Sequence, residues 1–247
     1  MNGFDALAPD YDRLRPGGAG WHELDERTLR AAGDARRLLD AGCGTGRFAV
    51  LAAERLHGRV WAVDASARML TEARARPGAR RVGWRRASLE RLPFRDGWFD
   101  AATAQLVIHL VEDRAAALSE LARVLGPGGR LVVATFAHEH FHEFFLNPYF
   151  PSIPAIDVAR FPDPAALAAE LEAAGLTGAG VERFDQPVAA EAEDVLERVR
   201  GRYISTLRLL AEDEYAAGLA RLEREVGGGR RAFAYTLRWA LVTGTRG

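Results

Sequence analysis

Hydrophobic and polar positions follow two different periods along most of the chain. Short apolar runs typical of buried strands occur in five places, near residues 36–41, 59–64, 81–86, 99–104 and 129–136. Segments with apolar residues at helical spacing lie before and between these runs, near residues 21–32, 46–56, 66–76 and 112–125. Strands that alternate with helices in this way predict a parallel, doubly wound sheet, with its ligand at the carboxyl ends of the strands.

The remaining stretches exceed what a minimal sheet needs. Residues 137–165 combine aromatic residues, histidines and prolines without clear periodicity, whereas residues 190–226 show the helical period over two segments. No repeat and no long linker divides the chain, which predicts a single domain over residues 1–247. Its predicted parts are an N-terminal lid and helix (1–35), a core (36–136) and a partly helical cap (137–177 and 186–230).

Glycines at every second position from 42 to 46 mark the turn between the first predicted strand and its helix. Glycine allows a sharp turn and lets a ligand touch the backbone, and the helix that follows offers unpaired N–H groups. The dinucleotide fingerprint, however, needs a glycine where Arg47 stands. Asp40 precedes the turn, where a carboxylate suits an ammonium group better than a pyrophosphate. Asp64 closes the second strand, where a carboxylate can accept both ribose hydroxyls. The pattern indicates a nucleoside that carries an amino acid.

Three segments, Asp40–Gly46, Val63–Ser66 and Leu125–Leu131, occur in an order and at a spacing that resemble class I S-adenosylmethionine-dependent methyltransferases. The resemblance covers roughly residues 36–136. It implies S-adenosyl-L-methionine as the cofactor and S-adenosyl-L-homocysteine as its product. It also implies an α/β fold with a Rossmann-like, seven-stranded, mostly parallel sheet, helices on both faces and an antiparallel last strand. Two further strands are therefore expected near residues 178–185 and 231–243.

The resemblance also implies which residues hold the cofactor. Asp40 faces the ammonium group, Asp64 takes the ribose diol, and Ser88 stands where many members of the family carry Asp beside adenine. Tyr11 and Arg15 close the site and meet the methionine carboxylate, unless the N-terminal segment is a plain leader. The full set of implied cofactor-binding residues is Asp40, Gly42, Gly44, Asp64, Ala65, Met69 (with ordinary core packing as its alternative), Ser88, Leu89, Gln105, Tyr11 and Arg15.

Four histidines are candidates for the catalytic acid or base, namely His109, His138, His140 and His142. His109 lies in an apolar run after the fourth strand, where a packed core histidine is the alternative. The other three follow the fifth strand, and the first and last of them, with Glu139, match a helical zinc motif. This segment opens the cap of a nucleoside-binding fold and no distant third ligand stands out, so we expect no metal. The aromatic run at residues 141–150 predicts a wall of the acceptor pocket.

Composition narrows the expected partners. The chain has 33 basic and 34 acidic residues and no basic block, so nothing indicates a nucleic-acid partner. Cys43 is the single cysteine, which excludes an internal disulfide and fits a reducing cytosol. No apolar stretch reaches the ~18 residues of a membrane span. We therefore expect a soluble, cytoplasmic enzyme that acts on a small molecule away from membranes, either alone or as a homodimer.

The predicted reaction is transfer of a methyl group from S-adenosylmethionine to an oxygen or nitrogen of a small-molecule acceptor, with carbon less favoured. Few catalytic residues are needed, because the methyl donor is already activated and the protein mainly aligns the acceptor and excludes water. Two alternatives stay open. One is a nonmethylating member that uses the cofactor site structurally or for a cyclisation. The other is a nicotinamide-dependent oxidoreductase, against which Arg47 and Asp40 argue.

Overall fold

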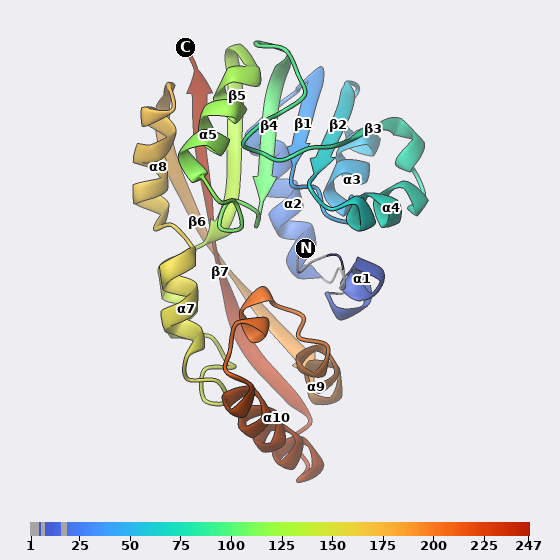
Figure 1. Ribbon diagram of the computed structural model, residues 1–247, viewed down its shortest axis with the longest axis vertical. Coiled ribbons are helices and arrows are strands. Elements are labelled where there is room, and N and C mark those ends of the chain that lie inside the picture. Colours follow the sequence, from blue (N-terminus) through green and yellow to red (C-terminus); the bar gives the residue numbers. More distant parts are fainter. Residues whose placement is uncertain (1–4, 6–7, 16–18) are drawn as a thin grey trace.

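The computed structural model describes residues 5, 8–15 and 19–247 of the protein. Its strands are β1 (Arg37–Ala41), β2 (Arg59–Asp64), β3 (Val82–Arg86), β4 (Phe99–Gln105), β5 (Leu125–Phe136), β6 (Leu176–Glu191) and β7 (Ala232–Arg246). These strands form one seven-stranded sheet in the order β3-β2-β1-β4-β5-β7-β6 (Figure 1). Within it, β7 runs antiparallel to both of its neighbours, and the other neighbouring strands pair in parallel. The predicted Rossmann-like sheet with an antiparallel last strand is confirmed.

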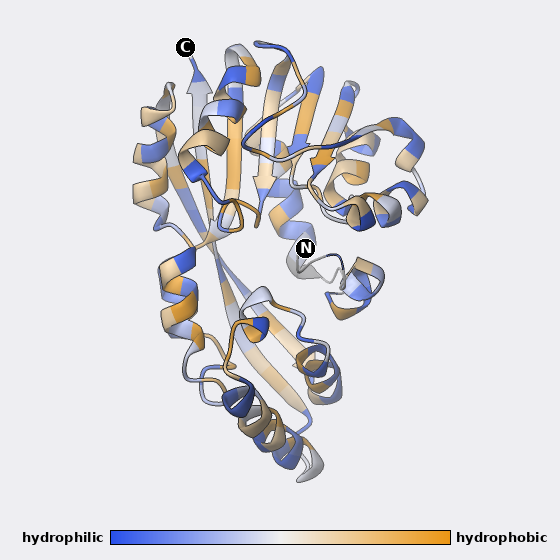
Figure 2. Ribbon diagram, viewed as in Figure 1, coloured by the Kyte–Doolittle hydropathy of each residue, from blue (hydrophilic) through white to orange (hydrophobic). Residues whose placement is uncertain are grey.

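Helices cover both faces of this sheet. The helices of the described chain are α1 (Tyr11–Leu14), α2 (Ala19–Ala32), α3 (Arg47–Arg55), α4 (Ala67–Ala75), α5 (Arg114–Val124), α6 (His138–His142), α7 (Ile153–Arg160), α8 (Pro164–Ala173), α9 (Ala192–Arg200) and α10 (Glu212–Gly227), with short 3-10 helices η1 (Ala8–Asp10), η2 (Ala79–Arg81) and η3 (Ser205–Arg208). Leu121 of α5 and Leu167 of α8 pack into the apolar cluster on one face, and Leu24 of α2 and Phe48 of α3 into the cluster on the other. In Figure 2 the middle strands are largely hydrophobic, whereas the helices mix hydrophobic and hydrophilic positions. Among the described residues, no helix combines the length and the hydrophobicity that crossing a membrane requires.

The helices α7 and α8 were not predicted, and neither were the short helices α1 and α6. α8 begins after Asp163, whose carboxylate accepts a hydrogen bond from the Ala165 amide (2.8 Å), and Pro164 occupies its first position. A capping aspartate followed by proline is a signal for a helix start. The residues that follow are mostly alanine and leucine on every side, so the amphipathic period that reveals a helix is weak.

β6 and β7 form a long antiparallel ribbon that leaves the core and continues into the cap (Figure 1). Their pairing runs from Leu176 opposite Arg246 to Glu191 opposite Ala232. The prediction of a strand near residues 178–185 was therefore too short. Pro187 suggests the end of a strand, but β6 is the edge of the sheet, where proline can stand because its missing N–H has no partner to lose.

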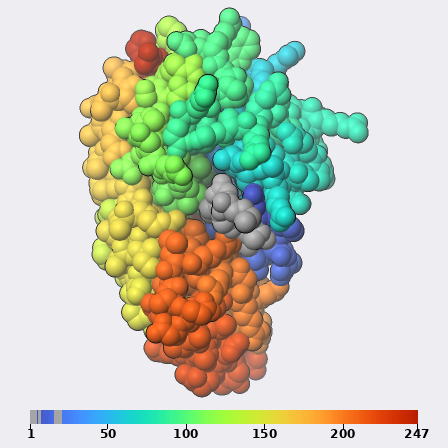
Figure 3. Space-filling view, in the orientation of Figure 1, coloured from blue at the N-terminus to red at the C-terminus, as the bar shows by residue number. Residues whose placement is uncertain are grey.

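The cap has an apolar cluster of its own. Phe150, Val199, Leu222 and Phe233 are among its buried members, and they come from four different segments. Figure 3 shows the cap, in orange, set against the green and teal core.

The N-terminal segment, residues 8–15, contacts both the core and the cap. The Asp12 carboxylate accepts a hydrogen bond from the Thr45 hydroxyl (2.7 Å) in the core. Arg15 Nε donates to the carbonyl of Tyr203 (2.7 Å) in the cap. This part of the chain is thus held in place rather than loose. Residues 1–4, 6–7 and 16–18 of the predicted N-terminal lid lie outside the described residues.

Candidate active site

The cofactor pocket is a cavity of about 670 Å³ at the carboxyl ends of β1, β2 and β4. A smaller adjoining cavity, the turn pocket, shares Gly42, Gly44 and Gln105 with it and is also lined by Asp40 and Arg15. The structure therefore brings all of the predicted cofactor-binding residues to two adjoining cavities. Those that line the cofactor pocket are Tyr11, Gly42, Gly44, Asp64, Ala65, Met69, Ser88, Leu89 and Gln105.

The glycine turn has a left-handed backbone at Gly42 and Gly44, and at Gly42 it also leaves no room for a side chain. Gly42 and Gly44 have φ angles of +73° and +53°, in the left-handed region that glycine tolerates. A Cβ atom on Gly42 would lie 2.3 Å from Val107 Cγ2. The Gly42 amide donates to the Val63 carbonyl (2.8 Å) and the Gly44 amide to Asp64 (2.8 Å). What these glycines offer a ligand is therefore space rather than free N–H donors.

Asp64 ends β2, and both of its carboxylate oxygens are hydrogen-bonded. Oδ2 accepts from the Gly44 amide and Oδ1 from the Ser66 amide, each at 2.8 Å. Burial raises the pKa of this carboxyl, and the two amides act in the opposite direction. Each carboxylate oxygen has more than one lone pair. Asp64 can therefore hold the turn together and still accept hydroxyl donors from the pocket.

Asp40 is a buried carboxylate with one oxygen unused. Oδ1 lies 3.3 Å from the Thr103 hydroxyl, whereas Oδ2 is buried without a hydrogen-bond partner in the part of the chain that the structure describes. Burial raises the pKa of Asp40 to about 7. An unpaired buried oxygen is costly unless a ligand supplies the donor. In the turn pocket, this oxygen fits the ammonium group of an amino acid, as the resemblance implies.

Arg47, which stands where the dinucleotide fingerprint needs a glycine, has a buried structural partner. Its guanidinium pairs with the carboxylate of Asp25 on α2, with a second contact of 3.0 Å, and the Asp25 side chain is 2% exposed. Gln105 Nε2 lies 3.4 Å from the same carboxylate. The ion pair joins α2 to the start of α3 behind the glycine turn. It was not predicted, because a helix pattern alone does not say which charged residue turns inward.

The loop after β3 carries an acid that the family motif did not indicate. Ser88 donates its hydroxyl to Glu90, and Glu90 Oε1 accepts from the Glu112 amide (3.0 Å). All three residues line the cofactor pocket. This chain thus has a carboxylate two residues beyond Ser88, the position where many members of the family carry Asp.

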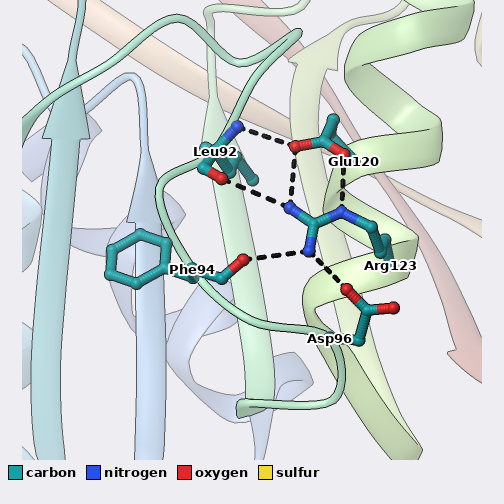
Figure 4. A network of polar contacts seen from close by, with 5 residues as sticks. All are labelled: Leu92, Phe94, Asp96, Glu120 and Arg123. Atoms are coloured by element: carbon teal, nitrogen blue, oxygen red, sulfur yellow. Dashed lines mark hydrogen bonds and ion pairs between the residues drawn. The ribbon is translucent and has the colours of Figure 1, made fainter.

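Arg123 of α5 fixes this loop (Figure 4). Its guanidinium donates to the carbonyls of Leu92 (3.2 Å) and Phe94 (2.9 Å) and pairs with Asp96 (2.6 Å). Glu120 accepts from the same guanidinium (2.6 Å) and from the Leu92 amide (2.7 Å). A planar group that donates in several directions holds its neighbours in one geometry. The loop that carries Ser88 and Glu90 is therefore anchored, beyond its pocket-lining residues, to a helix of the core.

The cap cavity is a further hollow, of about 170 Å³, between the sheet and the cap. Tyr235, Leu237 and Trp239 line it together, because alternate residues of a strand share one face. Trp239 stacks on Phe136 with 4.3 Å between ring centroids, and Phe136 stacks on His140 at 4.1 Å. Rings from two strands and one helix thus form a continuous aromatic wall.

The predicted aromatic wall at residues 141–150 contributes to this cavity in part. Phe141 and Phe144 line it. Phe145, Tyr149 and Phe150 instead pack in the apolar cluster of the cap.

Two of the four candidate histidines, His109 and His140, line the cap cavity. His109 stacks on Phe161 at 3.6 Å, and its Nδ1 is buried without a partner among the described residues. Burial lowers the pKa of His109 well below its ordinary value and that of His140 to about 4, so both are neutral at pH 7. His138 Nε2 lies 2.9 Å from the Phe161 carbonyl and His142 is exposed, so neither lines the cavity. Within the described ranges, no group of three metal-binding side chains comes together.

Tyr11 and Leu106 line all three cavities. Leu106 has a φ angle of +50°, which is rare for a branched side chain and is found mainly where a site requires it. It directly follows β4 and was not predicted, because a leucine in an apolar run gives no sign of an unusual backbone. The cofactor pocket and the cap cavity meet at these two side chains and at Leu110, which lines both of them.

Comparison with known proteins agrees with this geometry. A family model described as a methyltransferase domain matches residues 39–133. A demethylmenaquinone methyltransferase from Thermus thermophilus is 35% identical over 205 residues, which cover 70% of this chain and 91% of that protein. A ubiquinone/menaquinone biosynthesis C-methyltransferase from Syntrophotalea carbinolica is 41% identical over 142 residues, 54% of this chain and 60% of that protein. A demethylmenaquinone methyltransferase from Lactiplantibacillus plantarum is 36% identical over 140 residues, 52% of this chain and 59% of the relative.

Among solved structures, phosphoethanolamine N-methyltransferase 2 from Haemonchus contortus, in complex with phosphomonomethylethanolamine and S-adenosylhomocysteine, has the same fold. The TM-score is 0.63 at 19% identity, over 98% of this chain and 57% of that one. Likeness at this level shows architecture alone. The Thermus relative is similar over most of its length, and the residues present, above all the free oxygen of Asp40, fit S-adenosylmethionine as the cofactor. The chain belongs to the class I S-adenosylmethionine-dependent methyltransferases.

Proposed function

We propose that this enzyme methylates a ring carbon of a small hydroxylated aromatic acceptor bound in the cap cavity. The observation that carries the proposal is the junction of the two sites, because Tyr11, Leu106 and Leu110 line both the cofactor pocket and the aromatic-walled cap cavity. A carbon target departs from the predicted oxygen or nitrogen. The names of the three relatives support it. One relative is called a C-methyltransferase of ubiquinone/menaquinone biosynthesis, and the other two are called demethylmenaquinone methyltransferases.

The residues that would hold the cofactor divide by chemistry. Asp40 would face the ammonium group, Arg15 the carboxylate and Asp64 the ribose hydroxyls, with Ser88 and Glu90 on the adenine side. When bound, S-adenosylmethionine supplies a methyl group on a positively charged sulfur, which is electrophilic without further activation.

The cap cavity would bind the acceptor and remove its hydroxyl proton. Its rings stack on a planar acceptor and exclude water, which fixes the acceptor against the junction. His109 takes the proton of the acceptor hydroxyl at Nε2, since its Nδ1 is buried and the ring is neutral at pH 7. The ionised oxygen then places electron density on the neighbouring ring carbons, which makes them nucleophilic. The carbon that gains the methyl group then loses its ring proton to water, which restores the aromatic ring, and His109 returns its own proton to the acceptor oxygen.

The test uses S-adenosylmethionine with a ¹³C-labelled methyl group and a panel of naphthols and hydroxynaphthoates. We expect product whose ¹³C shift reports a methyl group on a ring carbon. Replacing His109 by Phe, which keeps the stack on Phe161, should lower kcat about 100-fold without changing S-adenosylhomocysteine affinity. His57→Gln, an exposed histidine outside the three cavities, serves as the control. Transfer to oxygen alone, or no transfer by protein that binds S-adenosylhomocysteine, would contradict the proposal.

A further inference from the structure

The charged groups of the cap cavity do not balance. Among its described lining residues, Arg15 and Arg198 are cationic, and Asp157 is the sole carboxylate. Asp157 already has its own partners, since Arg160 Nη1 lies 3.5 Å from it and the Thr206 hydroxyl donates to it. Two guanidinium groups therefore face the cavity with no carboxylate to neutralise them there.

Arg198 has little else to pair with. Its nearest carboxylate is Asp194, one turn earlier on α9, at 3.9 Å, and the Asp194 side chain is 60% exposed while that of Arg198 is 21% exposed. A pair at this distance with a solvated partner contributes little. A mostly buried cation without close compensation is unfavourable unless a ligand brings an anion.

Two tyrosines line the same cavity as Arg198. Neither the Tyr203 nor the Tyr235 hydroxyl has a hydrogen-bond partner in the described part of the chain, and both residues line the cavity. Burial raises the pKa of both phenols, which keeps them protonated, while the charge of Arg198 acts on both in the opposite direction. The Tyr235 ring is fixed by stacking on Phe145 at 4.2 Å. Besides Arg15, the cavity thus presents the Arg198 cation and two neutral hydroxyl donors that have no hydrogen-bond acceptor among the described residues.

The cofactor accounts for the other guanidinium. Arg15 lines the turn pocket as well as the cap cavity, and the turn pocket also holds the free oxygen of Asp40. A cation and an anion there match the carboxylate and the ammonium group of the methionine moiety. Arg198 does not line the turn pocket or the cofactor pocket, so its charge remains for the acceptor.

We infer that the acceptor is an aromatic acid, and that its carboxylate binds Arg198 and the hydroxyls of Tyr203 and Tyr235. This inference rests on the proposed function and narrows it, because the quinones named for the relatives carry no such charge. The aromatic walls hold the ring, and His109 takes the proton of its hydroxyl. Arg198 favours acids over neutral rings of the same shape. A carboxylate is planar and matches the two parallel donors of a guanidinium.

The experiment compares two probes that differ in the carboxylate alone, 3-hydroxy-2-naphthoate and 2-naphthol. Each is titrated by fluorescence into the full chain saturated with S-adenosylhomocysteine. We expect the acid to bind about tenfold or more tightly than the naphthol, the range of a charged hydrogen-bonded pair. Arg198→Met should remove that preference and leave 2-naphthol binding within about twofold. Tyr203→Phe and Tyr235→Phe should each weaken the acid alone, by about three- to tenfold.

Arg200→Met is the matched control, since Arg200 lies on the same helix and pairs with Glu223 at the surface. It should keep the preference for the acid. Equal affinity of the wild-type protein for the two probes, no binding of the acid, or a preference that survives Arg198→Met would each overturn the inference. The wild-type comparison needs no variant to fold. If a neutral naphthol is methylated at carbon as fast as the acid, the proposed function stands and this inference fails. If the acid binds tightly but is not methylated, carboxylate recognition stands and the proposed function fails.

Discussion

The cofactor pocket and the cap cavity adjoin, yet they are built in different ways. The cofactor pocket is shaped by backbone: strand ends and glycines such as Gly42 and Gly44 decide where a ligand fits. The cap cavity is shaped by side chains that come from segments far apart in the chain, including His109, Phe161 and Tyr235. One site depends on local turns and the other on tertiary packing. A substitution in one site should therefore leave the stability and ligand binding of the other site unchanged.

The largest expected effect lies behind the glycine turn. Arg47→Met leaves the buried carboxylate of Asp25 without its partner and should lower the free energy of unfolding by about 3–5 kcal/mol, measured by urea denaturation. Arg55→Met, on the same helix, removes a side chain that is 54% exposed beside a Glu26 that is 33% exposed, and should cost less, about 1 kcal/mol. Adding Asp25→Leu to the first variant should restore most of the loss. Equal losses at positions 47 and 55 would show that the buried pair is not what joins α2 to the turn.

The apolar cluster of the cap gives the next effect. Leu222→Ala opens a cavity among fully buried residues and should cost about 2–5 kcal/mol. If the two sites are independent, hydrogen exchange should quicken in α10 and leave β1 unchanged, and S-adenosylhomocysteine affinity should stay within about twofold. Leu209→Ala, which truncates a side chain that is 55% exposed, should change stability by less than about 0.5 kcal/mol. Loss of S-adenosylhomocysteine affinity in the Leu222 variant would show that the cofactor pocket depends on the packing of the cap.

Gly42→Ala tests whether backbone room defines the cofactor pocket. The added Cβ would meet Val107 at 2.3 Å in a left-handed turn, and the combined strain and clash should cost about 2–4 kcal/mol. Gly128→Ala has nearly the same φ, +74°, and nothing within 4 Å of its Cβ, so it should show the backbone strain alone, about 1–2 kcal/mol. Calorimetric titration with S-adenosylhomocysteine should find weakened binding in the first variant and normal binding in the second. Normal binding in both would mean that the turn tolerates side chains.

The smallest expected effect is on the pH dependence of stability and of S-adenosylhomocysteine binding. The pKa of Asp40 is raised to about 7 in the folded protein from 3.8, so the protein without cofactor should lose stability as pH rises from about 4 to about 7. The ammonium group favours the ionised form, so S-adenosylhomocysteine affinity should rise with pH through about 7. Asp40→Asn should remove this rise and weaken binding about tenfold at about pH 8. Asp185→Asn, in an exposed pair with Arg238, should keep the wild-type profile. An unchanged profile in the Asp40 variant would exclude Asp40 as its source.

The same contrast explains what the sequence could predict. The strands of the core and the glycine turn were predicted because their signals, apolar runs and spaced glycines, lie within a few residues of each other. Leu106 and Glu90 were missed, since an unusual φ angle and a displaced acid leave no local pattern. Arg198 and Tyr203 reach the cap cavity through packing between α9, η3 and β7, which no single stretch of the chain encodes. The length of β6 was underestimated, because the resemblance implies a strand only near residues 178–185 and gives no sign that the strand continues into the cap.

Strand β7, within the ribbon that it forms with β6, sets the depth of the cap cavity in discrete steps. Tyr235, Leu237 and Trp239 face the cavity at every second position of β7, and each such step spans about 6.6 Å. Inserting or deleting two residues in both strands would lengthen or shorten the cavity by one rung while keeping the same face inward. A change of one residue would turn these rings to the opposite side. The length of the cap cavity can therefore be changed in steps of two residues without altering the glycine turn or the cofactor pocket.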